Sequence, residues 1–334
     1  MKSPENLALE CAALGVQVAV SDNMQLRAGS AGWDMFDRPV SNKSVFPLYC
    51  TAKPVLGLAF VLKIATIGVK FNSTVRDLLP WAKGIDPDLT IGQLSAGFSS
   101  EYPLPAAMAV SMPTCQRKEF VRGMLLQATS VAHYDEAIQW IVYDEICATQ
   151  LGVSLGQAVQ EQLISMNDGD EGLVWPSWPS NGLEDIWDQL ILDGLQSEQD
   201  RIPHLAMLSR RLAKKNAPEF LSRGTALGMC HWVRTLLSAV SVHEDCRKFI
   251  MKSGERTPRY VLGGFDSIDL HLGADSGLHV YGSYSGGGSG LVFADVAGSF
   301  AACALFTSMA KGVDACRARF ASVLSYVEPS SLKL

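Results

Sequence analysis

Apolar and polar residues near the two ends of the chain follow the pattern of β-strands. Residues 16–20 and 24–28 are strand-like and flank the polar run Ser21-Asp22-Asn23, which predicts a β-hairpin that ends at residues 29–32. Near the other end, short apolar runs separated by glycines predict five strands, and a last amphipathic stretch predicts a closing helix at residues 313–327. The five predicted strands are residues 260–264, 268–272, 278–282, 290–294 and 301–307.

The long region between these strands has helical spacing. A strongly apolar segment that ends near residue 68 carries Pro54 close to its start. Because proline is tolerated only in the first turn of a helix, this helix should begin at residues 49–51. Trp175 and Trp178 lie in a predicted loop at residues 175–182. Further helices are predicted at residues 74–79, 89–94, 137–163 with a break at Gly152, 183–195, 205–214 and 226–240.

Strands at both ends and helices between them favour the α+β class. The simplest architecture is one antiparallel sheet built from both chain termini and flanked by helices, with a large, mainly helical lobe inserted. We place the sheet lobe at residues 1–48 and 255–334 and the helical lobe at residues 49–254. An active site is then expected between the two lobes.

Composition and charge exclude several classes of protein. The chain has 334 residues, 48% of them hydrophobic, which is enough for one large domain or two lobes. A net charge of -6 without a long basic cluster argues against a nucleic-acid partner. Pro4 and Glu5 stand where the apolar core of a secretory signal would begin, and the apolar stretch 55–67 is too short to span a bilayer. We therefore expect a cytoplasmic protein with no membrane partner.

The eight cysteines lack the spacing of a zinc or redox motif, because no two of them form a Cys-x-x-Cys pair. Without an export signal, the default expectation is free and mostly buried thiols. We expect neither a metal site nor a cofactor. A chemical role for any one cysteine must therefore be argued from its neighbours.

Cys50 and Lys53 form the strongest candidate pair for chemistry. Their spacing at a predicted helix start places both side chains on one helical face. A thiol there gains from the helix dipole and from backbone N–H groups, and a lysine one turn later can take its proton or stabilise the thiolate. The same spacing also arises by chance, with the lysine simply solvated.

Residues 44–54, which include Cys50 and Lys53, resemble the serine β-lactamase and penicillin-binding-protein-like family, in particular its class C β-lactamase, esterase and transacylase branch. In that family the nucleophile is the serine of Ser-x-x-Lys, followed by an apolar helix. Later family blocks are similar to residues 68–80 and 89–95. The resemblance extends over nearly the whole chain and implies a β-lactamase/transpeptidase-like fold, with Cys50 at the nucleophile position.

The family's second motif, Tyr-x-Asn, is matched by Tyr134-Asp135-Glu136. By resemblance, Tyr134 is the general acid or base that moves a proton between nucleophile and leaving group. Glu136 replaces the asparagine, and near Lys53 it would keep that lysine protonated. The alternative for Tyr134 is a half-buried side chain that packs at a helix start.

The third motif, Lys-Thr-Gly or His-x-Gly on a strand, aligns with Tyr284-Ser285-Gly286, so the usual cation or imidazole is absent. By resemblance, the backbone N–H groups of Cys50 and Gly287 form an oxyanion hole. The alternative at this place is a flexible glycine-rich turn. Tyr284, Ser285, Gly286 and Glu136 are candidates for substrate binding. So are Trp175 and Trp178, as a wall of an acyl pocket or as a packing plug.

The departures from the family pattern alter the expected chemistry. A cysteine nucleophile forms a thioester, which reacts readily with amines and other thiols and more slowly with water. Loss of the third-motif cation removes the usual partner of a substrate carboxylate, which argues against β-lactams. The sequence therefore predicts a transacylase that moves an acyl group from a thioester, ester or amide donor, through Cys50, to a small amine or alcohol acceptor.

By resemblance to the transacylases of this branch, we expect the enzyme to act in natural-product biosynthesis, and an acyl thioester on a carrier protein is a further candidate donor. Three alternatives stay open. The first is an esterase or amidase of the same fold, and the second is a non-catalytic binding protein in which Cys50 is inert. The third is a cysteine introduced in place of a natural serine.

Overall fold

The computed structural model describes about three fifths of the chain in several ranges. The predicted helices at 183–195 and 205–214 and the predicted strands at 260–264 and 268–272 lie outside them. The described residues are 3–22, 25–34, 37–82, 84–95, 113, 116, 119–120, 122–123, 125, 138–166, 174–175, 222–251, 266–267, 280–284, 288–295, 297–310 and 312–327.

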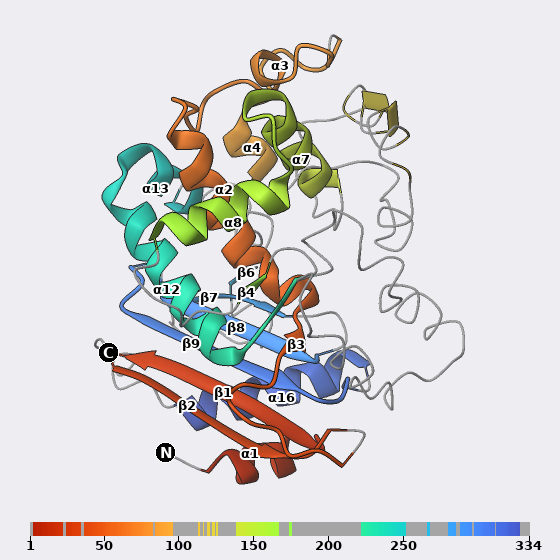
Figure 1. Ribbon diagram of the computed structural model, residues 1–334, viewed down its shortest axis with the longest axis vertical. Helices are drawn as coiled ribbons and strands as arrows, with labels where there is room; N and C mark the ends of the chain where they lie inside the picture. The colour runs from red at the N-terminus through yellow and green to blue at the C-terminus, as the bar shows by residue number, and fades with distance from the viewer. Residues whose placement is uncertain are drawn as a thin grey trace.

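A six-stranded antiparallel sheet joins the two ends of the chain (Figure 1). Its order is β2-β1-β9-β8-β7-β6, so the N-terminal hairpin pairs through β1 with the last strand, β9. This confirms the predicted α+β class and the sheet built from both termini. The strands are β1 (Gly15–Asp22), β2 (Gln25–Gly32), β6 (Asp266–Ser267), β7 (Val280–Tyr284), β8 (Gly290–Asp295) and β9 (Phe300–Phe306).

Helices cover both faces of this sheet. α1 (Pro4–Glu10) and α16 (Gly312–Val327) lie on one face, and α12 (Ala226–Val242) lies on the other with α2 (Lys53–Ala65) packed against it (Figure 1). Along β9, Cys303 and Leu305 face the α12 side, while Phe300 and Phe306 face the α1–α16 side. Strands that are buried on both faces are continuously apolar, which is the pattern that made β8 and β9 recognisable.

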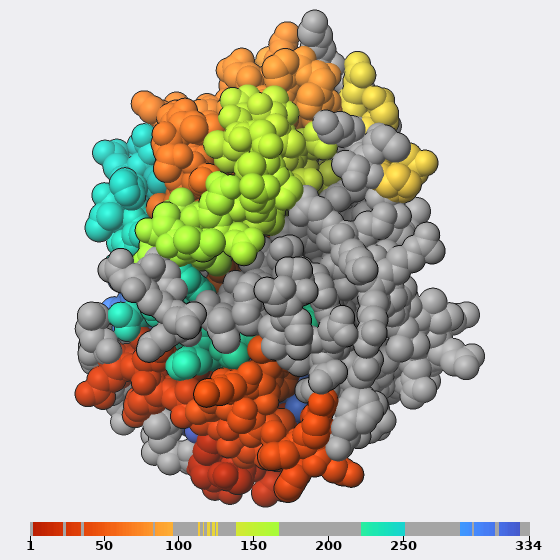
Figure 2. All heavy atoms as spheres, in the orientation of Figure 1, coloured from red at the N-terminus to blue at the C-terminus, as the bar shows by residue number. Residues whose placement is uncertain are grey.

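The remaining described helices gather around α2, in the upper part of the molecule as Figure 2 shows it. Gly152, with φ +73°, separates α7 from α8 where the helical pattern broke. The helices predicted at residues 74–79, 89–94 and 137–163 are thus confirmed, whereas α13 was not predicted. The elements around α2 are η1, a 3-10 turn (Tyr49–Ala52), and the helices α3 (Val75–Leu78), α4 (Ile91–Ser95), α7 (Ile138–Gln150), α8 (Leu155–Met166) and α13 (Glu244–Met251).

The N-terminal hairpin is longer than the sequence predicted. β2 continues through Gly29 to Gly32, where the glycines were read as the end of the strand. A Cβ atom at Gly29 would be 2.6 Å from Cγ of Pro4, so this glycine lets α1 lie directly on the strand. The glycine-rich run therefore reflects close packing of a helix.

A second, three-stranded sheet was not predicted. It has the order β3-β5-β4 and consists of the two-residue strands β3 (Phe46–Pro47), β5 (Arg223–Gly224) and β4 (Val174–Trp175). The prediction of a loop at Trp175 is therefore wrong, and residues 176–182 lie outside the described part. Strands of two residues are too short to show alternation, so only contacts between distant segments define them.

Among the helices that the structure describes, none combines the length and apolarity needed to cross a membrane.

Candidate active site

Cys50 and Lys53 lie one turn apart where the chain passes from η1 into α2. The backbone N–H of Lys53 donates to the carbonyl oxygen of Cys50, closing the 3-10 turn, and Pro54 follows in the first turn of α2. This agrees with the predicted helix start, except that Cys50 lies in a 3-10 turn just before the α-helix. The proline explains the boundary, since its ring is accommodated only in a first turn.

Lys53 is fully buried, with 0% of its side chain exposed, whereas Cys50 is partly exposed. Burying an ammonium group costs considerable free energy unless the surroundings compensate it. The alternative of a solvated surface lysine is therefore wrong. A partly exposed cysteine one turn from a buried lysine is compatible with a cysteine nucleophile that an adjacent base activates.

Tyr49, the residue before Cys50, has a strained backbone. Its φ of +47° lies in the left-handed region, which a bulky side chain rarely adopts. Such strain persists only where the surrounding structure enforces it, and it is concentrated at functional sites. The Tyr49 side chain is buried, and burial raises the pKa of its hydroxyl, an effect that the nearby Arg223 opposes.

The small sheet holds the segment that leads into Cys50. The N–H of Leu48 donates to the carbonyl oxygen of Ser222 over 2.9 Å, and Arg223 of β5 pairs with Pro47 on one side and with Trp175 on the other. Arg223 is fully buried, and burial lowers the pKa of its guanidinium while Tyr49 opposes that effect. The backbone of Trp175 is thereby placed two strands from the chain that enters the candidate site.

The strand β7 ends at Tyr284, the first residue of the predicted third motif, and it contacts η1, the turn that contains Cys50. η1 contacts both β7 and β8. A Cβ atom at Gly290, the first residue of β8, would be 2.8 Å from Oγ1 of Thr51, the residue that follows Cys50. Tyr284 ends β7 and pairs with Leu291, so the end of β7 and the start of β8 meet beside η1.

The structure thus brings Cys50, Lys53, the backbone of Tyr284 and the backbone of Trp175 into one region. The other predicted site residues lie outside the described part of the chain, and their roles stay predictions. These residues are Tyr134, Glu136, Ser285, Gly286, Gly287 and Trp178.

Sequence reasoning missed Tyr49, Arg223 and Thr51. Their residue types are ordinary, and no motif marks Arg223, which is distant in sequence from the turn that it adjoins. A non-glycine residue with positive φ has no reliable sequence signal. Only the three-dimensional arrangement identifies these three as neighbours of the candidate nucleophile.

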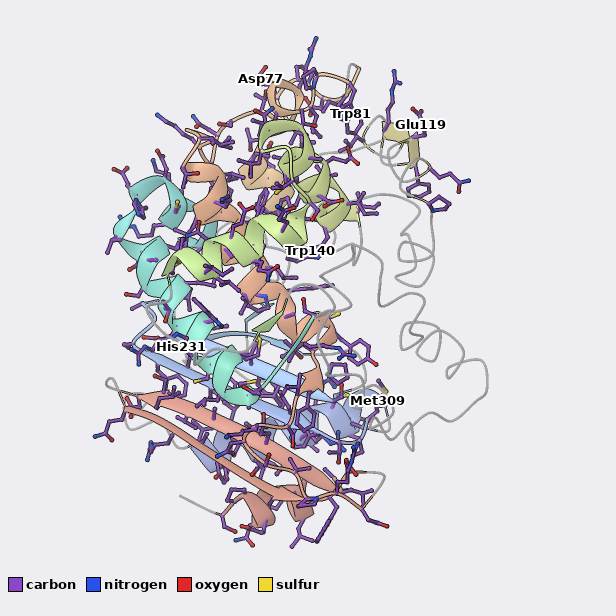
Figure 3. All side chains as sticks on the ribbon, viewed as in Figure 1. Asp77, Trp81, Glu119, Trp140, His231 and Met309 are labelled. Atoms are coloured by element: carbon purple, nitrogen blue, oxygen red, sulfur yellow. The ribbon has the colours of Figure 1, made fainter. Side chains whose placement is uncertain are left out.

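A buried polar cluster supports α2 from the side of α4 and α7. The hydroxyl of Tyr143 lies 2.6 Å from Oγ of Ser95 and accepts a hydrogen bond from Nε2 of Gln139 over 2.7 Å. Its ring stacks on Phe60 of α2 with centroids 3.9 Å apart and meets Trp140, labelled in Figure 3, edge-on. Burial raises the pKa of Tyr143 to about 12, so its hydroxyl stays a neutral partner. This cluster fixes the helix that begins with Lys53.

Of the other described cysteines, only Cys316 of α16 is partly exposed like Cys50, and the remaining five are buried. Cys11, Cys147, Cys230, Cys246 and Cys303 are buried, and no disulfide joins any cysteine that the structure describes. Burial raises the pKa of Cys230 to about 12, which keeps that thiol protonated and unreactive. Among the described side chains, no group of three His, Cys, Asp or Glu residues could hold a metal ion.

No protein-family model matches the chain, and no curated protein matches it by sequence. Solved structures do match it over nearly its whole length. One is EstCE1, a hydrolase with promiscuous acyltransferase activity, with a TM-score of 0.65 at 14% identity and 96% of each chain covered. Another is a class C β-lactamase from Rhodobacter sphaeroides, with a TM-score of 0.64 at 13% identity and 97% of each chain covered.

A third similar structure is a β-lactamase/D-alanine carboxypeptidase from Pseudomonas syringae, with a TM-score of 0.66 at 10% identity and 97% of each chain covered. At such low identity, the likeness concerns the fold. The six-stranded sheet, the helices on both of its faces and the full-length matches together show that this chain has the β-lactamase/transpeptidase fold.

Proposed function

We propose that this protein is an acyl-transferring enzyme that works through a covalent thioester on Cys50. The observation that carries the proposal is the fully buried Lys53 one turn after a partly exposed Cys50. The strained backbone of Tyr49 and the hydrolase described among the similar structures support it.

In the first step, the Cys50 thiolate attacks the carbonyl carbon of the acyl donor. A sulfur–carbon bond forms, and the carbonyl oxygen becomes an oxyanion that the N–H groups of Cys50 and Gly287 would stabilise. Collapse of this intermediate breaks the bond to the donor's sulfur, oxygen or nitrogen. That leaving group takes a proton from Tyr134, which we assign as the proton carrier together with Lys53.

In the second step, an amine or alcohol attacks the thioester. The acceptor gives its proton back to Tyr134, the sulfur–carbon bond breaks, and the Cys50 thiolate is regenerated. Attack by water instead of the acceptor would make the protein a hydrolase. The hydrolase with promiscuous acyltransferase activity among the similar structures makes esterase or amidase activity the second candidate.

We expect an acyl thioester to add its acyl mass to the wild-type protein at Cys50 and nowhere else. Cys50→Ala should abolish the adduct, and Lys53→Met should slow its formation by about 10²-fold or more, as loss of a proton-transfer partner does. Intact-mass spectrometry followed by peptide mapping measures both effects.

Lys63→Met is the matched control, because Lys63 lies on the same helix and makes a part-exposed ion pair with Glu161 over 2.9 Å. That variant should acylate at the wild-type rate. An adduct that forms equally fast in Cys50→Ala would refute the proposal. Product that appears only with an added amine or alcohol indicates transfer, whereas product without an acceptor indicates hydrolysis.

A further inference from the structure

Arg319 of α16 is a buried arginine with four hydrogen bonds. Its side chain is 4% exposed, and the guanidinium lies 4.8 Å from the centroid of the Phe306 ring. Nε donates to the carbonyl oxygen of Cys11 over 3.0 Å, and Nη2 donates to Oγ of Ser308 over 2.9 Å. Nη1 donates to the carbonyl oxygens of Ser308 over 2.6 Å and Gly288 over 2.9 Å.

The contact with Gly288 links this arginine to the β7–β8 connection. Gly288 has φ +61°, and a Cβ atom there would be 2.8 Å from Sγ of Cys316 and 3.0 Å from Cβ of Ala310. The helix α16 therefore packs directly on the backbone of Gly288. The guanidinium of Arg319 sets the orientation of its carbonyl.

Ser289 and Gly290 connect Gly288 to the candidate site. The carbonyl oxygen of Ser289 accepts a hydrogen bond from the N–H of Phe306 over 2.8 Å, and Gly290 lies against Thr51. The segment 288–290 thus contacts α16 and β9 on one side and Thr51 of η1 on the other. In Figure 1, α16 and α2 lie on opposite sides of the sheet.

We propose that Arg319 is a positioning residue that holds the segment 288–290 against Thr51, in the geometry that stabilises the oxyanion formed on acylation of Cys50. The proposal rests on the proposed function. Removing the guanidinium leaves the buried carbonyl oxygens of Cys11, Gly288 and Ser308 without this donor, so the segment shifts. A misplacement of about 1 Å near reacting groups slows a reaction by about 10²-fold.

Two reactions of the Cys50 thiol distinguish a positioning role of Arg319 from a general contribution of Arg319 to the stability of the fold. Acylation by a thioester passes through an oxyanion, whereas alkylation by iodoacetamide displaces iodide from carbon without forming one. In Arg319→Met, we expect Cys50 acylation to fall about 10²-fold while its alkylation rate stays near that of the wild type. Arg319→Lys should lie between, since a lysine supplies a charge without the planar set of donors.

Arg317→Met is the matched control on the same helix, because Arg317 is 54% exposed and 3.7 Å from Asp314. It should acylate and alkylate like the wild type.

A cavity of about 680 Å³ lies beside Arg319 and is also lined by Met309, Ala315 and Ala318. It would let a small cation reach the position that the guanidinium leaves empty in an Arg319→Ala variant. Met309 is labelled in Figure 3 beside α16. Millimolar ethylguanidinium should therefore restore part of the acylation rate of Arg319→Ala.

Gly288→Ala tests the same segment without altering Arg319, and Gly152→Ala is its control. Gly152 has a similar φ of +73° but no atom within 4 Å of the added Cβ. Gly288→Ala should lose acylation selectively, and Gly152→Ala should not. This pair decides the question if the Arg319 variants fail to fold.

Wild-type acylation rates in a folded Arg319→Met or Gly288→Ala variant would overturn the inference and leave the proposed function intact. Acylation and alkylation that fall equally would also overturn it, because the effect would then be general. If the wild-type protein forms no Cys50 adduct, the proposed function and this inference fail together.

Discussion

Gly290→Ala introduces one methyl group between β8 and the turn that carries Cys50. The added Cβ would be 2.8 Å from Thr51 Oγ1 and 3.0 Å from Leu305 Cδ2, whereas ordinary contact begins at 3.4 Å. The end of the leucine side chain can rotate away. Thr51 is fully buried and β-branched, so it has little rotamer freedom. The turn must therefore shift by about 0.6 Å, the difference between 3.4 and 2.8 Å.

This shift should affect both stability and chemistry. Overpacking of a filled interior destabilises a protein by about 1–3 kcal/mol. A displacement of about 1 Å costs about 10²-fold in rate, so a shift of about half that size should slow Cys50 acylation by on the order of ten-fold. Urea unfolding measures the first effect, and single-turnover acylation followed by mass spectrometry measures the second.

The companion variant Thr51→Ala removes the atom that the new methyl group meets. In the Gly290→Ala/Thr51→Ala double variant, we expect most of the acylation rate to return, and the double-mutant cycle should show a coupling of the two sites. A Gly290→Ala variant with wild-type rate and stability would refute the close approach of β8 to η1. So would a folded double variant without any recovery.

Three further measurements test other parts of the structure. Iodoacetamide at pH 8 should modify Cys50 well before Cys230, because burial raises the pKa of Cys230 to about 12 and keeps it protonated; equal rates by peptide mapping would contradict this. Tyr143→Phe should lower the free energy of unfolding by about 1–3 kcal/mol, since two buried polar partners lose their bond. The pKa of Tyr143 is raised to about 12, so the stabilisation of the folded state by its neutral hydroxyl is complete below pH 10 and declines as the pH rises towards 12. The free energies of unfolding of the wild type and of Tyr143→Phe, measured in urea, should therefore converge towards pH 12. Gly29→Ala should lower the melting temperature, because its Cβ would be 2.6 Å from the ring of Pro4; an unchanged melting temperature would mean that α1 does not rest on β2.

The position of the candidate nucleophile follows from local pattern. Pro54 near the start of an apolar segment indicates where α2 begins, and a helical turn relates Cys50 to Lys53 in any environment. The break between α7 and α8 at Gly152 is equally local. These features depend on backbone geometry over a few residues, and the structure agrees with them.

The six-stranded sheet was predictable from its apolar runs, whereas the three-stranded sheet was not. β9 and residues 290–294 of β8 are apolar because both of their faces are covered, and such runs are visible in a sequence. β3, β4 and β5 have two residues each, so their pairing follows from long-range contacts. For the same reason, the two-residue strand at Trp175 was not recognised, and sequence analysis assigned it to a loop.

Sequence alone determined the class of fold, the chain positions of the main strands and helices, and the pairing of Cys50 with Lys53 on one turn. Only the tertiary structure decided that Lys53 is buried, that Tyr49 is strained and that Arg319 binds Gly288, a partner 31 residues away. Helical and strand periodicities arise from neighbouring residues, whereas burial and long-range hydrogen bonds arise from segments that meet only in the folded chain.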